Sequence, residues 1–232
     1  MIRQKNISIS ILSLVISMLM LSTTTASAQY RKKKKVKIEL PDTVPFFNGF
    51  QVSADLLGVG MVHLADYGQY EAALRVNLRD RYFPIVEVGY GKADHEDEGT
   101  SLRYKTNAPY GRVGVDFNLL KDKHDKYRLL AGVRYGFTSF KFDLFHPGMK
   151  DPAWFDQVEF STEGVKCKYH WVEAVVGVDA TIWGPLHLGW SVRYRNRISH
   201  HVDELDNTWY VPGFGVSGTS ALGGTFNVII DI

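Results

Sequence analysis

The chain alternates between apolar and polar residues over long stretches, and residues 127–137 (YRLLAGVRYGF) show the pattern most clearly. Every second residue from Tyr127 to Phe137 is apolar, whereas Arg128 and Arg134 occupy positions between them. A period of two residues indicates a β-strand with one apolar face and one polar face. The sequence therefore predicts a strand here and raises the question of what each face contacts.

The same period recurs along the chain and predicts about eight strands. The segments that show it are 49–58, 70–78, 84–90, 112–119, 127–137, 171–182, 186–195 and 224–232. Their apolar faces carry no charged residue, whereas their polar faces carry arginines and carboxylates in near balance. The residues expected to form a charge network are Glu71, Arg75, Glu87, Arg112, Asp116, Arg128, Arg134, Glu173, Asp179 and Arg193.

The placement of the charges indicates which face is inside. Arginines and carboxylates lie in mid-strand, whereas lysines such as Lys105, Lys121 and Lys141 gather at strand ends and in connections. Arginine and carboxylate suit mutual pairing in a confined space. An arginine that faces lipid at the bilayer midplane costs about 2–4 kcal/mol. We therefore expect the apolar faces to contact lipid and the charged faces to neutralise one another in a narrow interior.

The connections between the predicted strands alternate in length. Short ones read RDRY (79–82), KDKHDK (121–126) and WGPL (183–186), whereas long ones span 92–108, 140–166 and 196–220. Short turns on the side of the termini and long loops on the other are typical of outer-membrane barrels. The sequence thus predicts an all-β protein, an eight-stranded antiparallel up-and-down transmembrane β-barrel closed without a free edge.

Aromatic residues gather towards the ends of the predicted strands. A bilayer interface holds amphipathic rings at such positions. The residues expected there are Tyr82, Phe83, Tyr90, Tyr110, Tyr127, Phe137, Trp183, Tyr194 and Phe226.

The N-terminus has the features of a cleaved export signal. Arg3 and Lys5 precede an apolar stretch at 7–21, and small residues then lead to a cleavage site between Ala28 and Gln29. The alternative is a transmembrane anchor, which the shortness of the apolar run disfavours. We expect a signal peptide at 1–28, a basic periplasmic tail at 29–47 and the barrel at 48–232.

Composition narrows the possible partners. Two of the 27 Lys and Arg lie in the leader, so the mature chain balances 25 basic against 25 acidic residues. A neutral chain is not expected to attract nucleic acid.

The single cysteine, Cys167, excludes an internal disulfide and a thiolate cluster. The acidic run at 94–98 lacks the glycine spacing of a calcium loop, so neither a metal nor a cofactor is expected.

On these strands and connections, the chain resembles the small eight-stranded outer-membrane barrels of the OmpX and OmpA-transmembrane-domain type, in an uncharacterised outer-membrane family of Gram-negative bacteria. The resemblance covers about residues 48–232. It implies an outer-membrane location among lipids and lipopolysaccharide, with periplasmic chaperones and the barrel-assembly machinery as partners during biogenesis. Such barrels often end in an aromatic residue, whereas this chain ends in Asp231 and Ile232.

The favoured function is structural, or a surface interaction made by long extracellular loops, without enzymatic activity. Since about eight strands leave room only for side chains, the barrel is not expected to be a general porin. The sequence identifies no loop partner.

Two alternatives stay open. Some small outer-membrane barrels act on lipid A as acylhydrolases or acyltransferases, using a serine, a histidine and an acid near the outer rim. Ser199, His201 and Asp203 share one face of an extended segment and supply these groups. The other alternative is a soluble periplasmic β-barrel that binds an apolar ligand, because alternation alone is the same in both kinds of barrel.

Overall fold

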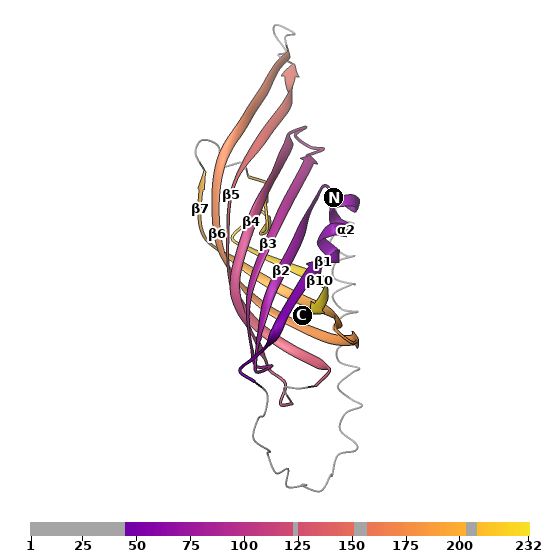
Figure 1. Ribbon diagram of the computed structural model, residues 1–232. Coiled ribbons are helices and arrows are strands. Elements are labelled where there is room, and N and C mark those ends of the chain that lie inside the picture. Colours follow the sequence, from indigo (N-terminus) through magenta and orange to yellow (C-terminus); the bar gives the residue numbers. More distant parts are fainter. Residues whose placement is uncertain (1–44, 123–124, 151–156, 203–207) are drawn as a thin grey trace, which may run out of the picture. The chain divides into compact units, whose positions relative to one another are not determined.

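The computed structural model describes residues 45–122, 125–150, 157–202 and 208–232, within the compact unit Val44–Ile232 (Figure 1). The predicted signal peptide, its cleavage site at Ala28 and Gln29, and most of the basic tail lie outside these residues.

One antiparallel sheet closes on itself in the order β1-β10-β7-β6-β5-β4-β3-β2, and β8 and β9 form a separate two-stranded sheet. The elements are β1 (Phe47–Asp55), α2 (Leu56–Leu64), β2 (Tyr67–Leu78), β3 (Tyr82–Glu96), β4 (Arg103–Asn118), β5 (Tyr127–Lys150), β6 (Gln157–Trp183), β7 (Leu186–Val202), β8 (Tyr210–Val211), β9 (Gly215–Val216) and β10 (Ser220–Asp231). The predicted eight-stranded antiparallel up-and-down barrel is confirmed.

The barrel has an apolar outer face and a charged inner face. On β3, Val86 and Val88 are 53% and 60% exposed, whereas Glu87 between them is 1% exposed. We call the exposed apolar residues of the sheet the apolar belt. Its members include Tyr70, Leu74, Tyr82, Val86, Val88, Tyr90, Val113, Phe117, Tyr127, Val133, Tyr135, Phe137, Val172, Val176, Val178, Trp183, Trp190, Val192, Tyr194 and Ile230. The placement of Phe83 and Tyr110 at an outer interface was wrong, because both rings are buried inside.

Tight turns join the strands at one end of the barrel, which we call the turn end. Between β2 and β3, Arg79 and Asp80 both have positive φ (57° and 53°), and Arg81 N donates to Leu78 O at 3.1 Å. Positive φ at both central residues matches the right-handed twist of a hairpin. Asn77 fixes this turn, since its side-chain oxygen accepts from Asp80 N at 2.8 Å.

The opposite end, which we call the hairpin end, differs from the prediction. Most of the segments 92–108 and 140–166 form strand and not loop, so that β5 and β6 reach 24 and 27 residues. In Figure 1 the hairpins β3–β4 and β5–β6 extend well past the other strands. The alternation of polar and apolar residues continues there, but the faces are exchanged: the inner face is apolar and the outer face is polar. Buried Phe142 and Leu144 and exposed Lys141 and Asp143 illustrate the reversal.

The first connection forms a helix that the two-residue period did not predict. Leu56, expected on the first strand, begins α2 instead. Asp55 ends β1 and caps α2, because its carboxylate accepts from Leu57 N and Gly58 N, each at 3.1 Å. Gly68 lets α2 approach β2, since a Cβ there would lie 2.3 Å from Val62 N.

Because β1 ends at Asp55, the wall has an opening that we call the lateral gap. In the described chain no strand pairs with Tyr67–Glu71 of β2 or with Ser220–Phe226 of β10 on the sides that face β1. The helix α2 packs against both strands here. The sheet is closed as predicted, and at this place β2 and β10 continue beyond the end of β1.

No helix among the described residues has the length and apolar character needed to cross a membrane.

Candidate functional site

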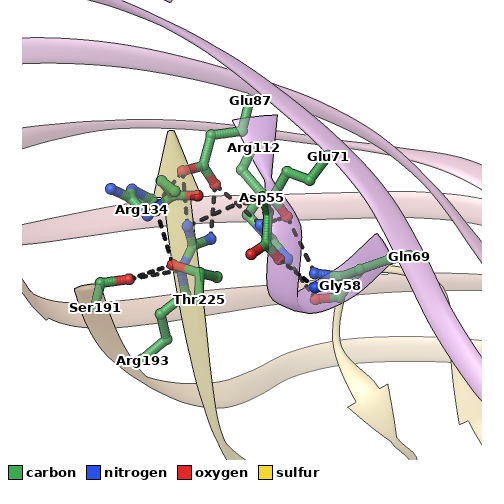
Figure 2. Close-up of polar contacts among 12 residues, drawn as sticks. Asp55, Gly58, Gln69, Glu71, Glu87, Arg112, Arg134, Ser191, Arg193 and Thr225 are labelled. Carbon is green, nitrogen blue, oxygen red and sulfur yellow. Dashed lines mark hydrogen bonds and ion pairs between the residues drawn. The ribbon is translucent and has the colours of Figure 1, made fainter. Parts of the chain in front are cut away.

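The inner faces of six consecutive strands, β2 to β7, together form a charged layer. Its members are Glu71, Arg75, Glu87, Arg112, Asp116, Arg134, Glu173, Asp179 and Arg193. The side chains meet because a period of two sends every second residue of each strand inward. Figure 2 shows part of the layer, in which the carboxylates and guanidinium groups point towards one another.

Glu87 lies at the centre of the charged layer. Its carboxylate lies 3.0 Å from Arg112 Nη1, 2.8 Å from Arg134 Nη1 and 2.9 Å from Arg193 Nη1. These residues come from β3, β4, β5 and β7, so one carboxylate links four strands. Three cations around one anion require further acids close by, because an unpaired buried charge is very costly.

Glu71 and Glu173 supply these acids. Glu71 lies 2.6 Å from Arg112 Nη1 and 3.1 Å from Arg193 Nη2, and Glu173 lies 2.9 Å from Arg112 Nε. Tyr110 donates its hydroxyl to Glu71 at 2.6 Å, and Trp171 donates its indole N–H to Glu173 at 2.6 Å. Both rings were missed as site residues. The alternation could have identified them, because Tyr110 lies two residues before Arg112 and Trp171 lies two residues before Glu173, on the same face of each strand.

Towards the turn end, the layer continues as a chain of ion pairs. Asp116 lies 3.0 Å from Arg134 Nη2 and 3.1 Å from Arg75 Nη2, and Arg75 Nη1 lies 2.7 Å from Asp179. Arg128, expected in the same network, lies apart at the turn end with its Nη2 3.5 Å from Asp80. The structure therefore brings nine of the ten expected residues together in the charged layer.

The charged layer leaves almost no free space. A cavity of about 20 Å³ lies within it, lined by residues that include Glu71, Arg75, Glu87 and Arg134. A cavity of this volume has room for about one water molecule. Side chains therefore fill most of the described interior at this level.

The segment Trp209–Gly218, which contains β8 and β9, closes the barrel above the charged layer, and we call it the inserted segment. Its residues Val211 and Phe214 are completely buried. Arg112 Nη2 donates to Gly213 O at 2.7 Å, and Arg195 Nη1 donates to Phe214 O at 2.8 Å. The prediction that 196–220 forms an exterior loop was wrong for this segment.

Apolar packing holds the inserted segment in place. It lies against buried residues of β4, β5 and β6, which include Tyr104, Phe142, Val165, Cys167, Tyr169 and Trp171. Tyr104 and Tyr169 donate their hydroxyls to Tyr210 O and Gly218 O, both at 2.7 Å. Gly213 has φ +81°, and a Cβ there would lie 2.6 Å from the ring of Tyr110. Glycine is therefore required at this position.

The candidate catalytic residues lie away from these groups. Ser199 and His201 are exposed near the hairpin end of β7, where they pair with His170 and Lys168 of β6. Asp203 lies outside the described residues.

The described residues contain no group of three or more potential metal ligands. In the acidic run, Asp94 pairs with Arg103 at 2.8 Å, and Asp97 accepts from Gly99 N and Thr100 N.

A protein-family model described as "Domain of unknown function (DUF6048)" matches residues 7–231. The chain belongs to this family. No curated protein matches the chain.

Three solved structures are similar to the chain. Ail, the attachment invasion locus protein of Yersinia pestis in complex with the heparin analogue sucrose octasulfate, has 9% identity and a TM-score of 0.36, over 79% of this chain and 93% of that one. CarO2 of Acinetobacter baumannii has 10% identity and a TM-score of 0.40, over 81% and 99%. A major outer membrane protein of Thermus thermophilus has 15% identity and a TM-score of 0.40, over 79% and 98%.

Ion pairs in the charged layer connect the strands of the wall. Each of its carboxylates contacts at least one guanidinium group, and the layer links strands that are distant in sequence. Such a network fixes the relative positions of the strands when all its members are satisfied.

Proposed function

We propose that the chain is an integral outer-membrane β-barrel with a structural or surface-interaction role, that it is not an enzyme and that it is not a general porin. The observation that carries the proposal is the reversed polarity of the wall, with valines outside and Glu87 inside. Water would not favour a continuous apolar belt around a charged core, whereas a bilayer would. For the same reason we do not favour a soluble barrel with an apolar ligand in its core.

The ends of the barrel support an orientation. Short turns face the periplasm in outer-membrane barrels, and longer connections face the exterior. We therefore place the turn end in the periplasm and the hairpin end outside the cell. Periplasmic chaperones and the barrel-assembly machinery are then the expected partners during biogenesis.

A band of lysines supports contact with lipopolysaccharide. On the outer face of β3 to β6, directly beyond the apolar belt at the hairpin end, lie Lys92, Lys105, Lys141, Lys166 and Lys168, which we call the lysine band. Lys141 and Lys166 are direct cross-strand partners. Since like charges opposite one another destabilise a sheet, anions at this surface would relieve the repulsion. Phosphate groups of lipopolysaccharide are such anions.

The hairpins β3–β4 and β5–β6 are the surface available to a partner outside the cell. They extend past the belt as paired strands, with register shifts between β5 and β6, and pack on the inserted segment through an apolar core. A rigid projecting sheet presents a fixed surface, which lowers the entropy cost of binding.

Membrane extraction and conductance test the proposal. We expect the full chain to stay in the outer-membrane fraction after urea washing and to change its gel mobility on heating. In planar bilayers it should give no stepwise conductance, because buried side chains fill most of the charged layer. Release by urea would contradict membrane insertion, and regular conductance steps would contradict the closed interior.

Lipopolysaccharide binding tests the lysine band separately. The double variant Lys141→Gln and Lys166→Gln should weaken binding of purified lipopolysaccharide to the refolded protein. Lys121 and Lys126 at the turn end provide the matched control, because changing both to Gln removes charge away from the band. Equal loss in both variants would show that the attraction is non-specific.

A further inference from the structure

A pocket of about 430 Å³ lies beside the lateral gap. Its lining comes from α2, from the start of β2, from the inserted segment and from the first half of β10. We call it the lateral pocket, and the residues used below are Leu57, Met61, Arg195, Phe214, Ala221 and Gly223. Its volume lies within the range of about 300–1,000 Å³ that small-molecule sites occupy.

The lateral pocket lies at the level of the apolar belt. On β10, Leu222 is 75% exposed and is paired with Tyr194, and Phe226 is paired with Trp190. Tyr194 and Trp190 both belong to the belt. The unpaired edge of β10 therefore borders the surroundings of the belt, and the lateral gap opens towards them.

The helix α2 borders the pocket and has an unusual composition for an exposed helix. Its sequence LLGVGMVHL contains no acidic residue, lysine or arginine, and His63 in the last turn is its single polar side chain. Yet Leu56, Leu57 and Leu64 are 46%, 41% and 89% exposed. A helix that is apolar all round is normally covered by protein or lipid. Its exposed leucines indicate that lipid lies directly outside the pocket.

The lining is mixed, because the polar side chains of Asp55, Gln69, Ser217 and Ser220 lie among apolar ones. Leu57, Met61, Phe214 and Ala221 supply apolar surface. At the inner end lies the guanidinium of Arg195, whose Nη1 is bound to the inserted segment. A Cβ at Gly223 would lie 3.1 Å from both terminal nitrogens of Arg195, so glycine leaves room for this group.

We propose that the lateral pocket binds one acyl chain of a membrane amphiphile, which enters from the lipid through the lateral gap. The inference rests on the proposed membrane location, because only a bilayer brings acyl chains to the gap. It adds a ligand site to a barrel whose central interior is closed. An acyl chain fits a site that opens sideways at belt level, since it need not cross water to enter.

Photolabelling of the full chain in lipid vesicles tests this inference. One set of vesicles contains a phosphatidylcholine with a diazirine in its acyl chain, and a second set contains a diazirine-bearing palmitic acid. Labelled peptides are mapped by mass spectrometry. Bulk lipid reaches the outer belt, whereas Tyr210, Val211 and Phe214 of the inserted segment are buried. We expect labels on residues 210–217, and we expect excess unlabelled palmitate or phosphatidylcholine to remove them. Comparison of the two sets of vesicles shows which amphiphile supplies the acyl chain.

Variants on α2 provide the matched comparison. Met61→Trp fills the pocket and should reduce labelling of residues 210–217 about tenfold, because the indole occupies the space of the acyl chain. Leu64→Trp adds the same side chain to the same helix, at a position that does not line the pocket. It should leave the labelling unchanged. Ala221→Leu is a second filling variant from β10, for use if Met61→Trp does not fold.

Heat-modifiable mobility and urea-resistant membrane association are measured on each variant, so that the two proposals fail separately. A protein that stays in the membrane but carries label only on the outer belt would overturn the acyl-chain site alone. Equal labelling of residues 210–217 in the filling variants and in Leu64→Trp would also overturn it. Loss of membrane association in the unchanged chain would overturn the proposed function.

Discussion

The carboxylate of Asp55 accepts a hydrogen bond from the backbone nitrogen of Phe226 at 3.1 Å, at the point where β1 stops pairing with β10. The same carboxylate caps α2 through Leu57 N and Gly58 N. One side chain thus satisfies backbone groups of two elements where a strand changes into a helix. This contact lies at the edge of the lateral gap that is nearer the turn end.

Replacement of Asp55 by alanine should lower the free energy of unfolding by about 2–3 kcal/mol, because a helix cap and a bond to a strand N–H are lost together. Asp55→Asn keeps one acceptor oxygen and should lose less. Urea titration of the refolded protein in lipid vesicles, followed by tryptophan fluorescence, measures the difference. Equal losses in the two variants would show that the hydrogen bonds contribute little.

Glu87→Gln should lower the free energy of unfolding by about 3–5 kcal/mol, because three buried guanidinium groups lose their shared anion. Glu96→Gln is the matched control, since Glu96 lies on the same strand but is exposed. It should change stability by less than about 0.5 kcal/mol. The same urea titration applies, and a small effect at Glu87 would mean that the charged layer is not a stabilising unit.

Gly213→Ala should destabilise the protein more than Gly164→Ala. Both glycines have positive φ (81° and 71°), so both alanines cost about 1 kcal/mol in backbone strain. At Gly164 a Cβ meets nothing within 4 Å, whereas at Gly213 it meets the ring of Tyr110 at 2.6 Å. The difference in unfolding free energy, expected at about 1–3 kcal/mol, measures how tightly the inserted segment is held.

Two glycines of α2 should respond in opposite directions. At Gly60 a Cβ would meet nothing within 4 Å, so Gly60→Ala should stabilise the protein by about 0.5–1 kcal/mol through helix propensity. At Gly58 a Cβ would lie 2.6 Å from Gln69 O, so Gly58→Ala should be destabilising. Thermal unfolding monitored by gel mobility distinguishes them. Stabilisation by both would show that α2 does not pack closely on β2.

Asp94 at the hairpin end should titrate below its ordinary value of 3.8, because hydrogen bonds from Arg103 lower the pKa of its carboxyl. A lowered pKa stabilises the folded hairpin above the ordinary pKa, and this contribution is lost as the pH falls through the folded value. Carbon NMR of the carboxyl group in detergent micelles follows the titration. Arg103→Ala should return the pKa towards 3.8, and an unchanged titration would show that the pair does not form.

Alternation predicted the eight strands, because the two faces of each strand meet different surroundings along its whole length. It assigns Glu87 and Arg112 to one face of their strands. It does not show that Arg193, from a strand far along the chain, reaches Glu87, because that depends on the stagger of the closed barrel. The partners within the charged layer follow from tertiary structure.

The sequence by itself determined the eight barrel strands, the two faces of their alternating segments and the short turns, since these depend on local periodicity and turn chemistry. Only the tertiary structure decided the places of α2 and the inserted segment. In both, the deciding contacts are long-range: Asp55 with Phe226, and Arg112 with Gly213. Every residue other than proline has a backbone carbonyl and N–H, so the sequence does not show which of them a side chain will bind. These contacts are known only from the closed barrel.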